Sequence, residues 1–221
     1  MTVKAMGITI KLMNKRLFII GWRLLFAAVN ILAIVVQLLY TSQYSTTFSL
    51  VNFFSYFTIL ANVFVSVVFI MSAWYVAVGR KPTLTDDIMR GASILYMIIV
   101  GLVYGTLLAD KDVGLTLPWV NIQLHYSMPL AVAIDWLYQP QRSKLKAKQT
   151  LAWLIFPFLY VTYTLVRGAV IGWYPYPFLN PAQVGGYGGV LAYALGILVA
   201  LGAVSLLIMA LGNRLRRHVN V

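Results

Sequence analysis

The chain has 221 residues, of which 61% are hydrophobic and only 10% are charged, and this balance excludes an ordinary water-soluble domain. It contains no cysteine, which excludes disulfide bonds, thiol nucleophiles and thiolate metal sites. A net charge of +12 would indicate nucleic-acid binding in a soluble protein. Here the basic residues flank apolar runs, so no nucleic-acid partner is expected.

Six apolar stretches reach the roughly 20 residues that a bilayer-crossing helix needs. In chain order they are 17–40, 53–76, 88–108, 119–138, 150–172 and 188–211. The first follows a basic start, as a signal peptide does, but its apolar core is too long for one and no small-residue cleavage site follows, so we interpret it as a retained span. The fourth is the least hydrophobic. The sequence therefore predicts an all-α polytopic membrane protein in which residues 1–221 form a single six-helix bundle.

The basic residues between these stretches show a strong asymmetry. If there are six spans, one side of the membrane carries Lys4, Lys11, Lys15, Arg16, Arg80, Lys81, Arg90, Arg142, Lys144, Lys146, Lys148, Arg214, Arg216 and Arg217. The other side carries only Lys111, while Arg23 and Arg167 fall inside spans. Because positive charge concentrates in cytoplasmic segments, the pattern predicts cytoplasmic N and C termini and a multi-pass protein of a bacterial inner membrane or plasma membrane.

Polar side chains inside spans are costly and face the bundle interior or an aqueous cavity, so they are the candidates for function. Thr58, His125 and Arg167 each lie about 8–9 Å below the outer interface at ~1.5 Å per helical residue. Asn62 lies one turn from Thr58 on the same helix face. These four can converge in one layer. Each also has a structural interpretation, because helical Thr bonds its own backbone, His and Asn bridge helices, and Arg reaches toward headgroups.

Other features have simpler interpretations. Asp135 lies near the inner end of its span, where pairing with the adjacent basic loop is expected. The segment 173–178, Trp-Tyr-Pro-Tyr-Pro-Phe, is typical of an interfacial aromatic belt locked by prolines, and it could also roof a cavity. No zinc-binding His-Glu-x-x-His helix, phosphate-binding loop, Gly-x-Ser-x-Gly turn or dinucleotide fingerprint is present, so neither a metal site nor a cofactor is expected.

Three segments carry a resemblance to a known family. They are 56–62 (Tyr-Phe-Thr-Ile-Leu-Ala-Asn), 124–130 (Leu-His-Tyr-Ser-Met-Pro-Leu) followed by Asp135, and 172–179 (Gly-Trp-Tyr-Pro-Tyr-Pro-Phe-Leu). The chain resembles the androgen-induced and androgen-dependent membrane hydrolases of animals, and more closely their bacterial six-span relatives. The animal members are intramembrane threonine hydrolases that cleave fatty acid esters of hydroxy fatty acids.

The resemblance implies that Thr58 is a nucleophile and His125 its base, acting on a lipid or fatty-ester substrate. A threonine hydroxyl needs such a base because it is a weak nucleophile. Arg167 does not match the animal pattern; from its position we expect it to bind a substrate carboxylate, and Asn62 or a backbone amide to face the oxyanion.

A non-catalytic alternative stays open at this point. The protein would then be a small transporter or a lipid-binding scaffold whose polar layer is a translocation or recognition site. A faint likeness between segments 54–58 and 158–162, which lie in spans of opposite direction, would suit an inverted repeat. Membrane lipids are expected partners in either case, and the oligomeric state is undetermined by the sequence.

Overall fold

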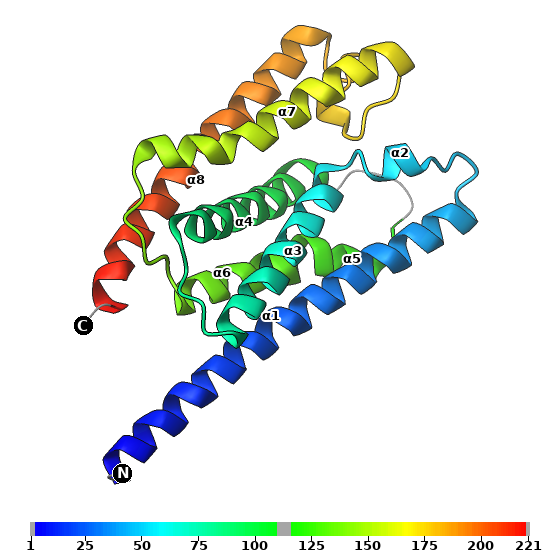
Figure 1. Cartoon of the computed structure of the whole chain (residues 1–221). Helices are drawn as coiled ribbons and strands as arrows, with labels where there is room; N and C mark the ends of the chain where they lie inside the picture. The colour runs from blue at the N-terminus through cyan, green and yellow to red at the C-terminus, as the bar shows by residue number, and fades with distance from the viewer. Residues whose placement is uncertain (1–2, 110–115, 220–221) are drawn as a thin grey trace.

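The computed structural model describes residues 3–109 and 116–219, with side-chain surroundings from Met13 to Arg216 (Figure 1). Every regular element in this part of the chain is helical. The elements are α1 (Val3–Tyr44), α2 (Leu50–Phe53), α3 (Phe57–Ala77), α4 (Leu84–Val103) with the π turn η1 (Tyr104–Leu108), α5 (Pro118–Ile122), the π turn η2 (Gln123–Ser127), α6 (Met128–Tyr138), α7 (Ala147–Ile171), the 3-10 turn η3 (Pro177–Leu179) and α8 (Tyr187–Val219). The predicted all-α class is confirmed for these residues.

Five helices are long and apolar enough to cross a membrane. They are Met13–Tyr44, Phe57–Ala77, Leu84–Leu108, Ala147–Ile171 and Tyr187–Arg216. These match the first, second, third, fifth and sixth predicted spans. The predicted fourth span, 119–138, is helical but is not among the five, because the polar side chains of Asn121, Gln123, His125 and Asp135 lower its hydropathy.

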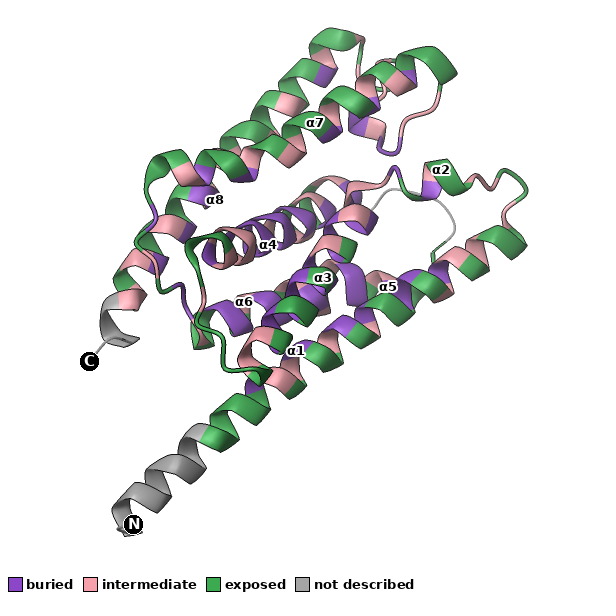
Figure 2. Cartoon of the chain, viewed as in Figure 1, coloured by how far each residue is buried: buried purple, intermediate pink, exposed green. Residues whose placement is uncertain are grey.

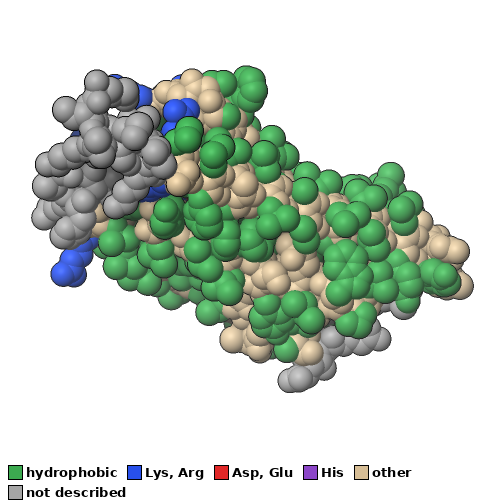
Figure 3. Space-filling view, turned by 90° about the horizontal axis from the view of Figure 1, so that it is seen from below, with side chains coloured by type: hydrophobic (Ala, Val, Ile, Leu, Met, Phe, Trp, Pro, Cys, Tyr) green, Lys and Arg blue, Asp and Glu red, His purple; other side chains and the backbone are tan. Residues whose placement is uncertain are grey.

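The helices differ in how deeply they are buried. Figure 2 shows buried residues concentrated on α3, α4 and α6, whereas α7 and α8 are largely exposed. The exposed side chains are apolar, including Phe158, Val170 and Val199, which are 67%, 79% and 71% exposed. Figure 3 shows hydrophobic side chains over most of one face, with Lys and Arg at one end. An apolar surface of this extent needs a lipid environment rather than water.

The segments rich in Lys and Arg lie at one end of the bundle. Arg16 of α1 donates to a backbone carbonyl at the end of α3 at 2.9 Å. Asp87, near the start of α4, accepts from the backbone N–H of Ser143 at 2.7 Å. The backbone N–H of Leu145 donates to Asn213 near the end of α8 at 2.9 Å. The start of α1, the α3–α4 and α6–α7 loops and the end of α8 are therefore neighbours, and we call this the basic end.

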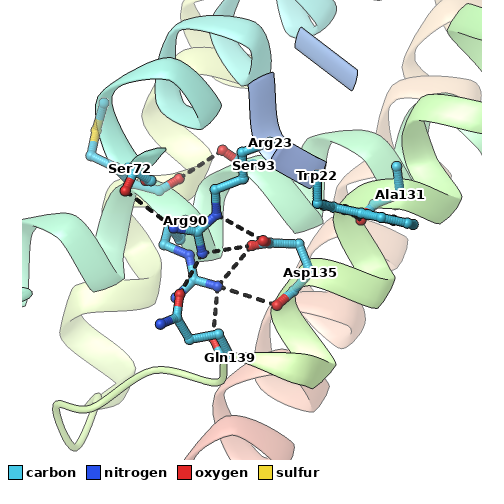
Figure 4. A network of polar contacts seen from close by, with 9 residues as sticks. Trp22, Arg23, Ser72, Arg90, Ser93, Ala131, Asp135 and Gln139 are labelled. Carbon is cyan, nitrogen blue, oxygen red and sulfur yellow. Dashed lines mark hydrogen bonds and ion pairs between the residues drawn. The ribbon is translucent and has the colours of Figure 1, made fainter. Parts of the chain in front are cut away.

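A buried ionic cluster joins α1, α4 and α6 near the basic end (Figure 4). Asp135 accepts from Arg23 at 2.7 Å and from Arg90 at 2.9 Å. The side-chain oxygen of Gln139 accepts from Arg23, and its carbonyl accepts from Arg90, both at 2.6 Å. The expectation that Asp135 pairs with the adjacent basic loop, 139–149, is wrong, because a buried carboxylate needs partners at its own depth and the two arginines supply them.

Helix α7 is attached to α4 beside its internal proline. Pro157 has no N–H to donate to the carbonyl of Trp153, and the hydroxyl of Tyr96 donates to that carbonyl instead, at 2.9 Å. The Trp153 indole N–H donates to the carbonyl of Ile88 at 2.9 Å. A Cβ at Gly91 would lie 2.1 Å from the Trp153 ring, so only glycine allows this contact. These contacts fix the half of α7 nearer the basic end.

Candidate active site

Thr58 lies at the start of α3, at the end of the bundle opposite the basic end. It is the second residue of the helix, which begins at Phe57 after the extended N-cap residue Tyr56, and the side chain of Tyr56 does not cap the helix. Its side chain is buried, with the residue 9% exposed. The Oγ1 atom of Thr58 lies 3.3 Å from Nε2 of His125. The structure thus brings together the two residues for which the resemblance implies the roles of nucleophile and base.

His125 lies in the π turn η2. The downstream Pro129 has no N–H to donate to the carbonyl of His125, so the regular hydrogen-bond pattern cannot continue here, and π turns are frequent at functional sites. Nδ1 of the imidazole lies 3.1 Å from the backbone carbonyl of Asn121. Because a carbonyl only accepts, this contact assigns the proton to Nδ1. Nε2 then presents its lone pair to the hydroxyl of Thr58.

Aromatic packing fixes the orientation of the imidazole. The ring of Tyr104, in the facing π turn η1, stacks on His125 with centroids 4.0 Å apart and planes 21° apart. The side-chain amide of Asn121 donates to the hydroxyl of Tyr104. Two π turns on neighbouring helices therefore hold the histidine between a stacking ring and a backbone acceptor.

Tyr176 is a site residue that the sequence analysis did not identify. Its hydroxyl accepts from the backbone N–H of Thr58 at 3.2 Å and lies 3.4 Å from Oγ1 of Thr58. Burial raises the pKa of this phenol above its usual value, so it stays protonated and available as a donor. The sequence marks the aromatic-proline segment 173–178 as an interfacial belt or the roof of a cavity, but it does not single out Tyr176.

The loop carrying Tyr176 is rigid for identifiable reasons. Pro175 and Pro177 restrict the backbone on either side of the tyrosine. Its ring stacks on Phe178 with centroids 5.2 Å apart and meets the edge of Tyr56 at 5.7 Å. At the end of α7, a Cβ at Gly168 would lie 2.1 Å from the Tyr174 ring. The loop is therefore held against both α3 and α7.

Asn62 lies beneath Thr58 and is fully buried. Its amide nitrogen donates to the carbonyl of Thr58 at 2.8 Å and to the carbonyl of Leu124 at 3.3 Å. Both amide hydrogens are therefore used, and neither is free to bind an oxyanion. The geometry gives Asn62 a positioning role, since it joins the start of α3 to the histidine turn.

Arg167 lies on α7 at the rim of the site rather than beside Thr58. It is half-buried and donates to the side-chain oxygen of Asn52 at 2.6 Å. Its guanidinium lies 5.3 Å from the centre of the Trp173 ring. The acidic residues Asp110 and Asp112 lie outside the described residues. Asn52 and Trp173 both line a cavity that contains Thr58, so Arg167 supports the wall of that cavity.

Two cavities meet at Thr58. The apolar cavity, of about 560 Å³, lies between α3, α4, α7 and α8. The polar cavity, of about 400 Å³, contains His125 and is lined by residues of α1, α2, α5 and the aromatic-proline loop. Thr58 and Tyr176 line both. Volumes of this size suit small-molecule or lipid ligands.

No cluster of three or more potential metal ligands occurs among the described residues. No family profile, no curated protein and no solved structure matches the chain.

Proposed function

We propose that the protein is a six-span membrane hydrolase that cleaves lipid esters, with Thr58 as nucleophile and His125 as base. The observation that carries this proposal is the 3.3 Å contact between Oγ1 of Thr58 and Nε2 of His125, in a histidine whose Nδ1 is held by the Asn121 carbonyl. This is the arrangement of an activated hydroxyl nucleophile, with a base oriented by a third group. Its location between two cavities supports access for both a substrate and water.

The proposed reaction has two steps. His125 takes the proton of Thr58 as Oγ1 bonds to the ester carbonyl carbon, and Tyr176 donates a hydrogen bond to the oxyanion that forms. The intermediate collapses by breaking the bond to the alcohol oxygen, which receives the proton from His125. In the second step His125 activates a water molecule from the polar cavity. That water releases the fatty acid from Thr58 and returns the hydroxyl.

The course of segment 118–138 supports a sixth span despite its low hydropathy. Just before its start, Leu117 donates from its backbone N–H to the side chain of Gln37 at 3.1 Å. Asp135, near its end, bonds to Arg23 close to the basic end. The segment therefore runs the length of the bundle. Its buried polar side chains, Gln123 and Asp135, face inward. The residues most exposed along it, between Ile122 and Leu137, are chiefly apolar or aromatic.

The grouping of Lys and Arg at the basic end supports a cytoplasmic location for that end, and with it cytoplasmic termini in a cell membrane. Reporter fusions in loop 139–149 are expected to give a cytoplasmic signal, and a fusion beside Lys111 an external one. A cytoplasmic signal beside Lys111 would contradict the six-span topology.

The resemblance to the animal membrane threonine hydrolases also supports the assignment, since the residues it matches, Thr58 and His125, lie in contact. Esters of fatty acids, including those of hydroxy fatty acids, are the substrate class that follows from it.

The decisive experiment replaces the nucleophile. Thr58→Ala is expected to abolish ester cleavage and labelling by a fluorophosphonate probe, at a stability cost of only about 1–2 kcal/mol. Thr58→Ser keeps the hydroxyl, so labelling should survive. Thr162→Ala is the matched control, because that threonine is exposed on α7 and bonds only its own helix backbone in the structure. Intact cleavage by a monodisperse Thr58→Ala protein would favour the transporter or scaffold alternative.

A further inference from the structure

The apolar cavity has the chemistry of a hydrocarbon-binding site. None of its described lining residues is charged. Its hydroxyl groups belong to Thr58, Tyr160 and Tyr176. The Tyr160 hydroxyl donates to the carbonyl of Ser55 at 3.0 Å, and the Tyr176 hydroxyl contacts Thr58. The Thr58 hydroxyl, the proposed nucleophile, therefore lies at one end of a space whose other walls are apolar.

The cavity extends away from Thr58 along two helices. On α7 its wall runs from Tyr160 to Leu151, and on α8 from Leu191 to Leu201. At ~1.5 Å per residue these walls are about 14–15 Å long, which suits an extended alkyl chain rather than a compact group. Lining residues such as Leu151 and Leu195 are 62% and 51% exposed, so the cavity opens sideways between α7 and α8. A hydrocarbon chain can enter there directly from the lipid phase.

The anchoring of α7 explains why this space stays open. Toward the basic end, the Trp153 ring packs against α4 at Gly91 and its indole N–H donates to α4. At the other end, Tyr160 is bonded to the segment before α3, and Gly168 packs against Tyr174. Pro157 lies between these attachments and lines the cavity. Helix α7 is thus attached on either side of Pro157, while the turn that contains Pro157 lacks one backbone hydrogen bond.

The polar cavity differs in its lining. Its lining includes the amide side chains of Gln37, Asn52, Asn180 and Gln183, together with His125. Its wall is supported by the Arg167–Asn52 contact. Amide groups can bind hydroxyls, carboxylates and water, which the wall of the apolar cavity cannot. An ester at Thr58 therefore has one direction for its hydrocarbon and another for its polar part.

We propose that the apolar cavity binds the acyl chain of a long, unbranched fatty acyl ester, and that the polar cavity receives the alcohol part and the hydrolytic water. This inference rests on the proposed hydrolase function and adds the orientation of the substrate. The acyl carbon bonds to Oγ1 of Thr58 and the alcohol oxygen departs into the polar cavity with the proton carried by His125. Helices α7 and α8 then select substrates by the chain length of the acid and not by the identity of the alcohol.

The test measures kcat/KM for p-nitrophenyl acetate, octanoate and palmitate with purified protein. Ala194 lines the apolar cavity, whereas Ala192, on the same helix, lines a different one. Ala194→Phe is expected to lower kcat/KM for palmitate at least about tenfold relative to acetate, because excluding two methylenes from an apolar site has that effect. Ala192→Phe should leave the ratio unchanged. An equal effect of Ala194→Phe on all three esters would overturn the inference.

A second variant and a second readout protect the test. Leu198→Trp narrows the same cavity at a position that is 49% exposed, so it carries little risk of misfolding and should give the same chain-length shift. Cross-linking of a photoreactive palmitate to Thr58→Ala protein needs no catalysis; label is expected on α7 and α8 and should fall in the Ala194→Phe background. If the parent protein cleaves no ester but the label is found on α7 and α8, the proposed hydrolase function is wrong. The binding of an acyl chain in the apolar cavity is then still supported. Cross-links confined to other helices would reject the cavity.

Discussion

The ionic cluster at the basic end and the Thr58 site are both buried polar groups, but they are built differently. In the cluster, both carboxylate oxygens of Asp135 bond to arginines at 2.7–3.1 Å, and Arg23 also donates to the carbonyl of Ser72. At Thr58 the groups in contact are two hydroxyls, a backbone N–H and the imidazole of His125, which can be neutral. Their contacts are 3.2–3.4 Å long, and two cavities reach the Thr58 hydroxyl. Buried ionic groups joined by several short hydrogen bonds hold helices together, whereas loosely bonded groups beside a cavity can exchange partners with a substrate.

The sharpest test of this difference is removal of the base. His125→Ala should lower ester cleavage by about 10²–10⁴-fold, the usual contribution of a general base, with little change in thermal stability. Rates with a p-nitrophenyl ester and a melting curve measure the two effects. A loss of activity that merely follows a loss of folded protein would place His125 with the structural groups.

The opposite pattern is expected for Asp135→Asn. It leaves the buried guanidinium of Arg23 and the half-buried guanidinium of Arg90 facing a neutral amide, which should cost about 3–5 kcal/mol of stability. Asp86→Asn is a control, because its partner Arg80 is 37% exposed and such surface pairs contribute about 0–1 kcal/mol. An asparagine oxygen at this position can still accept from the backbone N–H of Thr83, as the carboxylate does in the cap of α4. Thermal unfolding in detergent checks both. Normal stability of Asp135→Asn with reduced turnover would mean that the cluster takes part in the reaction.

Tyr176→Phe separates a donor from a packing group within the site. The ring and its stacking on Phe178 remain, and only the hydroxyl is lost. If the phenol stabilises the oxyanion, the acylation rate should fall by about 10²-fold while KM changes little. Pre-steady-state release of p-nitrophenol measures this rate. A change in KM alone would indicate that Tyr176 only lines the cavities.

The smallest effect is expected for Arg167→Leu, because Arg167 is at the rim and half-buried. Cleavage of esters that carry a free carboxylate should fall by up to about tenfold, in line with loss of one charge-assisted hydrogen bond, while neutral esters change little. The ratio of the two kcat/KM values is the measurement. An equal loss for both ester types would indicate that Arg167 only holds Asn52 in place.

Much of the fold could be predicted from the sequence because lipid imposes simple rules on it. Long apolar runs predicted the five helices that are long and apolar enough to cross a membrane. Polar side chains at equal depth in the predicted spans indicated that Thr58 and His125 lie close together, and their side chains are in contact. The same reasoning would have paired Arg23 with Asp135, since both lie toward the inner ends of their predicted spans. The basic loop beside Asp135 suggested a nearer partner in sequence, and that choice was wrong.

Other features of the site could not be predicted from the sequence. The π turn at His125 depends on the packing of two helices as well as on Pro129, and one proline does not specify where a turn widens. Tyr176 lies in a loop more than a hundred residues from Thr58, and nothing in an aromatic-proline segment marks which ring turns inward. Asn62 shared a helix face with Thr58, but its amide turned to neighbouring carbonyls, a preference that only the three-dimensional surroundings decide.

The position of Thr58 at the start of α3 has an electrostatic consequence. The peptide dipoles of this 21-residue helix add to roughly half a positive charge at its N-terminus, where no side chain of the N-cap residue caps the first turn. Negative charge that develops on an oxygen at Thr58 is therefore stabilised by the backbone itself, without a cation. Because the site is buried within an apolar bundle, mobile ions screen this field poorly, and its contribution should vary little with salt concentration.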